Sequence, residues 1–336
     1  MTTSRRPTLS DVAAEAGVSK MTASRALRGA GDVSKASVDL VTQAARQIGY
    51  VGNPLAASLS GKRSGLIGVV IPSLTNIVFA EVLSGIAEGI EGSGMQPVFG
   101  VTNYNPDKEY EVIRNMLSWN PAGLIVTGLD QPEDTLRLLE NAPVSVVQIM
   151  DLDGTPVSAC VGMSHHAAGA AMAEALLAAG RTAFGYVGCG LDRDTRAHKR
   201  FDGFADGLAA QGVSLADREH YAGDSSIETG RQLTAQMLER QPDIDCIYYS
   251  SDVMSVGGYM HCLANGLSVP GDVAIAGFNN LQILAGLPLQ LATTDACRRQ
   301  IGERAAEIIL NRRESGTPGE PVFECLTPAI NLGQSL

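Results

Sequence analysis

The feature that most constrains the fold is a regular alternation, from Gly65 onward, of short apolar runs with longer segments whose apolar residues recur at helical spacing. Strands are predicted at 66–71, 97–101, 124–127 and 144–149, and helices at 77–90, 109–119 and 132–139. Strands that are joined through helices in this way pair in parallel. The alternation therefore predicts a parallel β-sheet that is covered by helices.

A second series of the same kind follows. Its predicted strands lie near 183–187, 246–250 and 273–277, and its predicted helices lie near 167–179, 201–210, 227–240 and 255–263. Two doubly wound lobes are the natural solution, and in such sheets ligands bind beyond the carboxyl ends of the strands. We therefore expect a ligand cleft between the two lobes.

Length and composition bound the class of protein. At 336 residues the chain exceeds one typical domain, and no apolar run is long enough to span a membrane. The polar, basic residues 1–7 lead into no export signal, so we expect the protein to stay in the cytoplasm. Its six cysteines lie far apart without a C-x-x-C pair, which favours reduced, buried thiols over metal ligation. Neither a metal nor a cofactor is predicted.

Charge is distributed unevenly along the chain. Residues 1–63 carry nine Lys and Arg against four Asp and Glu, a net charge of +5 in a chain whose total is -11. A compact basic segment on an acidic body favours a polyanionic partner for that segment. The alternative is a solvated basic tail, which the helical pattern of the same segment argues against.

Residues 8–48 are predicted to form three short helices. Thr8 and Asp11 have the spacing of a capping box, and Gly17 follows about two turns later as a stop signal. Ser19 is placed to cap a second helix that runs to Leu27, and a third helix is expected at 34–48. This is the spacing of a helix-turn-helix, whose second helix enters the major groove of DNA. Such helices could also form an inert bundle, but the cations and hydroxyls of the second helix favour DNA.

The segment 8–29, TLSDVAAEAGVSKMTASRALRG, resembles the headpiece signature of the LacI family of transcriptional regulators. The resemblance implies that Lys20, Met21 and Arg25 read base edges, where a guanidinium suits the acceptors of guanine. It also implies phosphate contacts for Thr22 and Ser24. The predicted DNA-binding residues of this segment are Thr8, Ser19, Lys20, Met21, Thr22, Ser24 and Arg25.

The next segment, 49–59, resembles the hinge of the same family, a short helix that orders on operator DNA. Leu59 aligns with the leucine that family members insert into the minor groove, where such a wedge kinks the duplex. Asn53 and Ala57 complete the predicted DNA-binding set. The family often has a basic residue at position 57, so the alanine is expected to forgo one minor-groove contact.

The resemblance implies an N-terminal all-α helix-turn-helix headpiece and an α/β, two-lobed, periplasmic-binding-protein-like effector domain with parallel sheets. The expected boundaries are 1–52 for the headpiece, 53–63 for the hinge helix and linker, and 64–336 for the effector-binding and dimerisation domain. Lobe one is expected to comprise about 64–160 and 294–320, and lobe two about 161–293 and 321–336.

Polar residues at the ends of predicted strands indicate where the effector site lies. After the first strand, residues 72–76 present hydroxyls and helix N-terminal amides that suit an anionic or polyhydroxylated ligand. The predicted effector-binding residues are Ser73, Asn76, Phe79, Arg196, Arg200, Ser251, Asp252 and Asn279. A helix cap is the alternative at each strand end, and for Asp252 both interpretations stay open.

Four cations, Arg193, Arg196, Lys199 and Arg200, cluster at the start of the helix predicted at 201–210. A positive group opposes the helix dipole at that end, and a bound carboxylate would compensate it. By resemblance Arg200, in the pattern R-x-x-G-F, is the effector-binding arginine of the family, and a bidentate contact with a carboxylate would be its strongest anchor. The alternative for Arg200 is a surface ion pair with Asp192, Asp194 or Asp202.

Within the family the chain is similar to the gluconate-operon repressors, through the segments PSLTNIVFAEVL at 72–83, MLSWN at 116–120, AIAGF at 274–278 and KMT at 20–22. Asn279 stands where sugar-sensing relatives often have aspartate, and the loss of that charge reduces repulsion of a sugar acid. A departure from the family is Ser164-His165-His166, which we interpret as a helix cap because adjacent histidines do not converge on one metal ion.

The sequence therefore predicts a ligand-regulated transcriptional repressor that is not an enzyme and binds operator DNA as a homodimer. The preferred effector is a sugar acid such as gluconate. The alternative is a cytoplasmic sugar or sugar-acid binding protein, or an enzyme, with the same α/β body. The sequence contains no phosphate-binding loop, no G-x-S-x-G elbow and no dinucleotide fingerprint after a strand, and an enzyme would leave the headpiece unexplained.

Overall fold

The computed structural model describes residues 5–28, 30–51, 64–315 and 321–336. The chain divides into two compact units, Met1–Ser64 and Gly65–Leu336. Within the described ranges, no helix is both long enough and apolar enough to cross a membrane.

The N-terminal unit contains three helices, α1 (Leu9–Glu15), α2 (Lys20–Leu27) and α3 (Lys35–Gln47). The predicted capping box is present, because the Thr8 amide donates to Asp11 Oδ2 at 2.7 Å and the Asp11 amide donates to Thr8 Oγ1 at 3.4 Å. The Ser19 side chain caps α2 by accepting from the Thr22 amide at 3.0 Å. Gly17 adopts φ +65° in the turn between α1 and α2, a conformation that glycine adopts without strain.

Small side chains let the three helices of this unit pack closely. Val12, Ala23 and Val41 are wholly buried and contribute one residue from each helix. Leu27, Lys20 and Met21 of α2 are exposed. The outer face of α2 therefore contributes nothing to the core and is free for another role.

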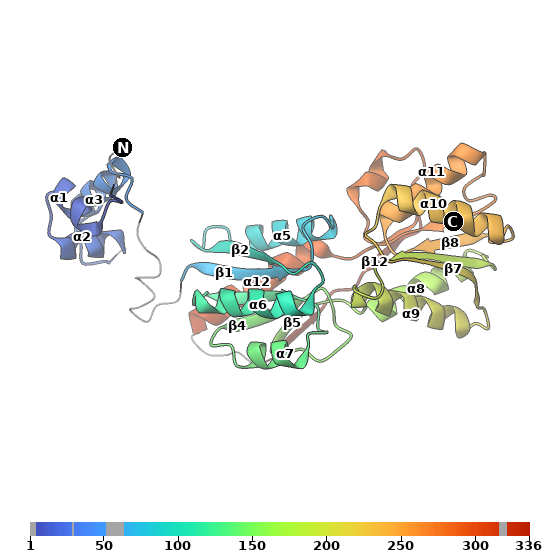
Figure 1. The fold of residues 1–336 in the computed structure, drawn as a ribbon, viewed down its shortest axis with the longest axis horizontal. Coiled ribbons are helices and arrows are strands. Elements are labelled where there is room, and N and C mark those ends of the chain that lie inside the picture. The colour runs from blue at the N-terminus through green and yellow to red at the C-terminus, as the bar shows by residue number, and fades with distance from the viewer. Residues whose placement is uncertain (1–4, 29, 52–63, 316–320) are drawn as a thin grey trace. The chain divides into compact units, whose positions relative to one another are not determined.

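The larger unit holds two parallel sheets, each covered by helices (Figure 1). We define lobe one as the six-stranded sheet, in the order β11-β5-β4-β3-β1-β2, with its helices. Its elements are β1 (Leu66–Ile71), α5 (Val78–Gly89), β2 (Gln96–Val101), α6 (Pro106–Ser118), β3 (Gly123–Thr127), α7 (Glu133–Glu140), β4 (Ser145–Ile149), β5 (Ala159–Gly162), α12 (Arg298–Ser315) and β11 (Val322–Cys325). Strands β1, β3 and β4 are almost wholly buried, as expected of parallel strands with both faces covered.

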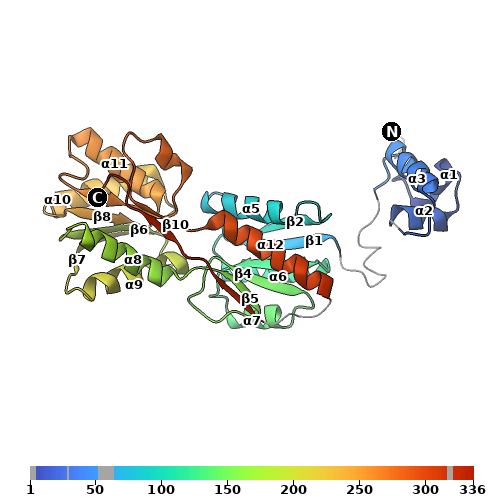
Figure 2. The same ribbon diagram turned by 180° about the vertical axis from the view of Figure 1, so that it is seen from behind.

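Lobe two is the four-stranded sheet, in the order β7-β6-β8-β9, with its helices. Its elements are α8 (His165–Ala178), β6 (Phe184–Cys189), α9 (Thr195–Ala209), β7 (Leu215–Tyr221), α10 (Ile227–Arg240), β8 (Cys246–Tyr249), α11 (Asp252–Asn265), β9 (Ala274–Ala276) and the short 3-10 helix η1 (Gln282–Gly286). A separate antiparallel pair joins β10 (Thr293–Asp295) to β12 (Ala329–Asn331). Figure 2 shows α12 lying along lobe one and the C-terminal segment running back toward lobe two.

Three details differ from the sequence expectation. Strand β7 was not predicted, because most of its residues are polar and it lies at the edge of its sheet. Helix α9 begins at Thr195, earlier than the 201–210 expected from its apolar spacing. The expected boundary that placed 321–336 in lobe two is wrong for Val322–Cys325, because β11 pairs in parallel with β5 of lobe one and the chain crosses only afterwards.

Helices α8 and α9 approach each other closely through two glycines. A Cβ atom added at Gly169 would clash with the backbone carbonyl of Arg200, and one added at Gly203 would clash with the carbonyl of His166. This contact packs residues 200–203 of α9 against the first two turns of α8. The close approach thus positions Arg200.

We predict that Gly169→Ala lowers the free energy of unfolding of the larger unit by about 2 kcal/mol, because overpacking outweighs the roughly 1 kcal/mol that alanine gains over glycine in a helix. Chemical denaturation measures the difference. Gly286→Ala is the matched control, since an added Cβ there meets no atom within 4 Å. Equal stability of the two variants would contradict the close packing of α8 on α9.

Candidate functional site

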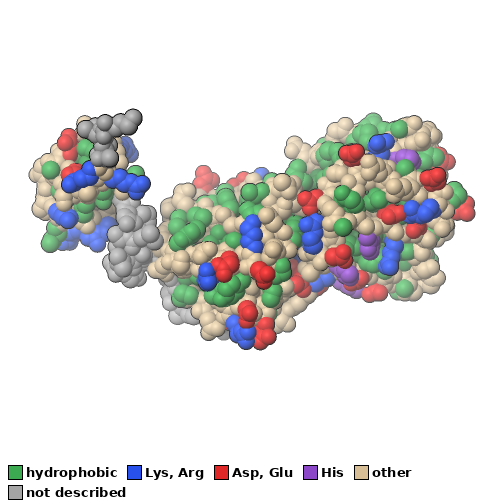
Figure 3. Space-filling model, viewed as in Figure 1, with side chains coloured by type: hydrophobic (Ala, Val, Ile, Leu, Met, Phe, Trp, Pro, Cys, Tyr) green, Lys and Arg blue, Asp and Glu red, His purple; other side chains and the backbone are tan. Residues whose placement is uncertain are grey.

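Helix α2 presents an exposed surface that carries basic side chains. Lys20 and Met21 are exposed, and 70% of the Met21 surface is accessible although methionine is usually buried. In Figure 3 basic side chains gather on the N-terminal unit, whereas basic and acidic side chains are interspersed on the larger unit. The hydroxyls of Ser19 and Thr22 lie 2.8 Å apart at the start of α2, and Ser24 is partly exposed. The arrangement can offer a cation, a flexible apolar side chain and hydroxyls to one partner.

Arg25 has an acidic partner that sequence reasoning missed. Its Nε donates to Asp32 Oδ1 at 3.2 Å, and its Nη2 forms an ion pair with Asp32 Oδ2. Both side chains are about half exposed, so the pair adds little to stability. The predicted contacts at Asn53, Ala57 and Leu59 lie outside the described residues.

A cavity of about 320 Å³ lies between the two lobes of the larger unit. Its walls come from the segments that follow β1, β2, β6, β8 and β9 and from the first turns of α9. These are the carboxyl ends of parallel strands, where ligands bind in open α/β sheets. Its lining includes the predicted residues Ser73, Asn76, Phe79, Arg196, Arg200, Ser251 and Asn279.

Asp252 does not line this cavity, so a direct effector contact at this residue is not supported. Its wholly buried carboxylate accepts from the Leu281 amide and from Thr293 Oγ1, both at 2.7 Å. Burial raises the pKa of Asp252 to about 6. Nor does its side chain cap α11; it ties the segment after β9 to the start of that helix instead.

The arginines of the cavity have different partners. Arg193 pairs with Asp224 at 3.3 Å, and Arg196 pairs with Asp194 at 3.2 Å. Burial alone would raise the pKa of Asp194, but the charges of Arg196 and Arg200 hold it below its ordinary value. Both arginines thus have carboxylate partners in the same lobe, at the exposed surface for Arg193 and in a mostly buried pair for Arg196.

Arg200 is buried without a carboxylate partner among the described residues. Its Nη2 donates to the Ser250 carbonyl at 3.0 Å, its Nη1 donates to His165 Nδ1 at 2.9 Å, and its guanidinium carbon lies 3.9 Å from the centroid of the Phe278 ring. Its Nε has no hydrogen-bond partner. The surface ion pair considered as an alternative is therefore absent among the described residues, and Asp194, whose pKa the charge of Arg200 helps to lower, acts on Arg200 only from beyond ion-pair distance.

Sequence reasoning also missed Tyr104 and the role of His165. Tyr104 lies just beyond β2, lines the cavity, and its hydroxyl accepts from Asn76 Nδ2 at 3.2 Å. Burial raises the pKa of Tyr104 to about 12, so the phenol is neutral. The strand-end rule that found Asn76 could have found Tyr104.

In the Ser-His-His run, Ser164 caps α8 as predicted, but His165 is buried against the cavity while His166 pairs outward with Asp206.

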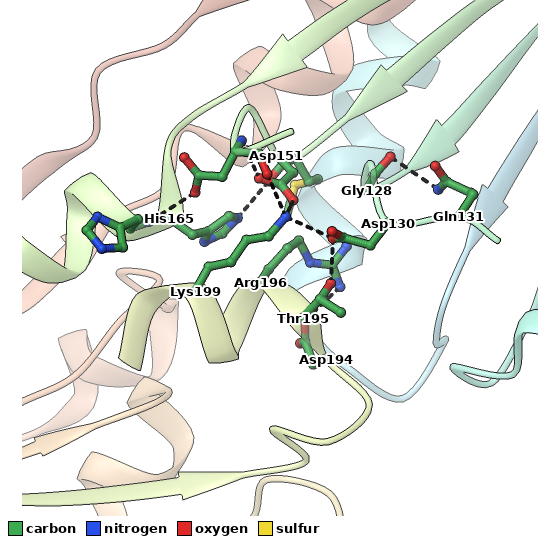
Figure 4. A network of polar contacts seen from close by, with 12 residues as sticks. Gly128, Asp130, Gln131, Asp151, His165, Asp194, Thr195, Arg196 and Lys199 are labelled. Carbon is green, nitrogen blue, oxygen red and sulfur yellow. Dashed lines mark hydrogen bonds and ion pairs between the residues drawn. The ribbon is translucent and has the colours of Figure 1, made fainter. Parts of the chain in front are cut away.

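A polar network joins the lobes next to the cavity (Figure 4). Lys199 Nζ donates to Asp151 Oδ2 at 2.6 Å and to Asp130 Oδ2 at 2.9 Å, and Thr195 Oγ1 donates to the same Asp130 oxygen at 2.8 Å. Burial raises the pKa of Asp151. Burial by itself would lower the pKa of Lys199, but the carboxylates of Asp151 and Asp130 raise this pKa above its ordinary value. Because both carboxylates follow strands of lobe one, α9 of lobe two is held across the cleft.

Comparison with known proteins extends over nearly the whole chain. Residues 64–318 match the family described as periplasmic binding proteins and sugar binding domain of LacI family, and residues 8–53 match bacterial regulatory proteins of the lacI family. The HTH-type transcriptional regulator GntR of Pseudomonas aeruginosa is 38% identical over 92% of this chain and 90% of that protein. GntR of Escherichia coli K12 is 35% identical over 94% of this chain and 95% of that protein.

Among solved structures, a LacI-family transcriptional regulator from Silicibacter pomeroyi superposes with a TM-score of 0.94 at 47% identity, covering 98% of this chain and 99% of that one. A likeness of this extent confirms the predicted fold class, a helix-turn-helix region followed by a two-lobed α/β domain with parallel sheets.

We predict that Lys199→Met destabilises the larger unit by about 2 kcal/mol, because it leaves the buried Asp151 carboxylate without its cation. The double variant Lys199→Met/Asp151→Asn should regain most of that loss, and a double-mutant cycle in chemical denaturation measures the coupling. Lys108→Met, at an exposed position of α6, is the control. Additive effects of the two single substitutions would contradict the cross-cleft pairing.

Proposed function

This chain belongs to the LacI family of bacterial regulatory proteins, and on that premise we propose that it is a DNA-binding transcriptional repressor whose operator affinity is controlled by a small metabolite. The observation that carries the proposal is the conjunction of two sites in one chain. One is the outward cationic face of α2, and the other is the interlobe cavity with the buried Arg200, which has no carboxylate within ion-pair distance among the described residues.

For DNA we infer that α2 enters the major groove, with Lys20, Met21 and Arg25 at base edges. Lys20 and Met21 are exposed and Arg25 is partly exposed, which supports this assignment, and so does the net positive charge of the first 63 residues. We propose contacts with the DNA backbone for Thr8, Ser19, Thr22 and Ser24. Asn53, Ala57 and Leu59 remain proposed contacts of the hinge, and two copies of the chain would read two half-sites as a homodimer.

For the effector we propose a sugar acid such as gluconate. Arg200 supplies the charge that a carboxylate neutralises, and Ser73, Asn76, Ser251 and Asn279 supply hydroxyl and amide groups for a polyhydroxylated chain. Two of the relatives are GntR regulators, which supports placing the chain in the branch of the gluconate-operon repressors. Binding would shift the balance between lobe arrangements to the extent that the ligand prefers one of them.

A cytoplasmic sugar or sugar-acid binding protein, or an enzyme, is disfavoured as an alternative. Either would leave the N-terminal unit without a function, and the relatives are transcriptional regulators. We propose that the protein acts in the cytoplasm, where bacterial operators lie.

Arg25→Ala should cost about 1 to 3 kcal/mol of binding free energy at one base pair of the operator and relax specificity there. Binding to a panel of single-base operator variants measures this directly. Arg46→Ala removes the same charge from the exposed end of α3 and is the matched control. A uniform loss across all sequences would make Arg25 a phosphate contact instead of a base contact.

Gluconate should raise the melting temperature of the full chain, because a ligand that binds the native state stabilises it. The uncharged hexitol D-glucitol, of the same chain length, should raise it much less, and Arg200→Met should abolish the response to gluconate. Arg231→Met, on the exposed surface of α10, should respond as the wild type does. A response to glucitol with none to gluconate would refute a sugar-acid effector.

A further inference from the structure

His165 occupies the first position of α8, directly after the chain passes from β5 of lobe one into lobe two. The side chain is buried, lines the interlobe cavity, and has a partner at each ring nitrogen. Nε2 lies 2.7 Å from the carbonyl oxygen of Met150, which follows β4 of lobe one, and Nδ1 lies 2.9 Å from Arg200 Nη1. The imidazole of His165 therefore connects lobe one to Arg200.

The partners define the protonation state of this ring. A guanidinium nitrogen only donates, so Nδ1 must be the accepting nitrogen and Nε2 must carry the proton that is donated to Met150. The imidazole is therefore neutral. Burial and the nearby charges of Arg200 and Arg196 lower the pKa of His165 well below its ordinary value, in agreement with this hydrogen-bond pattern.

Arg200 is held on three sides by groups that carry no net charge. Phe278 packs on its face, the Ser250 carbonyl accepts from Nη2, and His165 accepts from Nη1. Each contact orients the guanidinium without cancelling its charge. Its Nε remains buried and without a partner, although Arg200 lines the cavity. Arg196 differs, because its partner Asp194 is charged.

We propose that His165 is a positioning residue for the effector, and that its neutral Nδ1 acceptor orients Arg200 for a carboxylate while leaving the positive charge of Arg200 available. The inference rests on the proposed sugar-acid effector. A carboxylate at position 165 would orient the guanidinium equally well but would take the place of the ligand. A side chain without an acceptor would leave Arg200 free to turn.

Three substitutions at position 165 separate these roles. His165→Asn keeps a neutral acceptor close to the position of Nδ1, His165→Asp has nearly the same shape with a negative charge, and His165→Leu has no acceptor. Isothermal titration of the full chain with gluconate measures affinity, and the melting temperature and operator affinity without ligand show that each variant is folded. The adjacent His166→Gln, on an outward-facing side chain, is the matched control.

We expect His165→Asn to bind gluconate within about threefold of the wild type, and His165→Leu and His165→Asp to bind at least tenfold more weakly. If His165 only tied the lobes together through Met150, all three variants would lose affinity alike, because none retains the Nε2 donor. That result would overturn the positioning role, as would wild-type affinity in His165→Leu. If His165→Asp does not fold, the comparison of asparagine with leucine decides the question alone.

The two proposals fail in different ways. If the wild-type chain does not bind gluconate, the proposed effector is wrong and the role of His165 falls with it. If the wild type binds gluconate and Arg200→Met does not, but His165→Leu binds as the wild type does, only the inference about His165 is overturned.

Discussion

The close contact between α8 and α9 is the constraint on which the effector site depends. Gly169 and Gly203 leave no room for a Cβ atom between the two helices, so the first two turns of α8 lie against residues 200–203 of α9. This places His165, at the start of α8, within hydrogen-bonding distance of Arg200 on α9. The site is thus built on two helices, and their close packing at Gly169 and Gly203 supports its geometry.

Three cations of α9 have different partners. Arg196 is balanced by Asp194 within lobe two, Lys199 is balanced by Asp130 and Asp151 across the cleft, and Arg200 meets neutral groups. The first two pairs are complete without a ligand. Only Arg200 has no carboxylate within ion-pair distance among the described residues, and in the proposed function its charge selects an anionic effector next to the contacts that join the lobes.

Much of the fold and part of the site could be predicted from local patterns. The capping box of Thr8 and Asp11 was predicted and is present, because it depends on residues three positions apart. The strand-end rule located the cavity, because chain direction and parallel pairing bring those ends to one edge of a sheet. The same rule failed for Asp252, since it does not say whether a side chain turns toward the cavity or into the protein.

The sequence by itself determined the three helices of the headpiece, the parallel α/β class of the larger unit and the family to which the chain belongs, since each is expressed in spacings over a few residues. Only the tertiary structure decided that β11 joins lobe one, that Lys199 reaches two carboxylates of lobe one, and that Arg200 faces a neutral histidine. These contacts join residues tens to more than a hundred positions apart. Nothing in a local pattern encodes them, because they exist only when distant segments pack together.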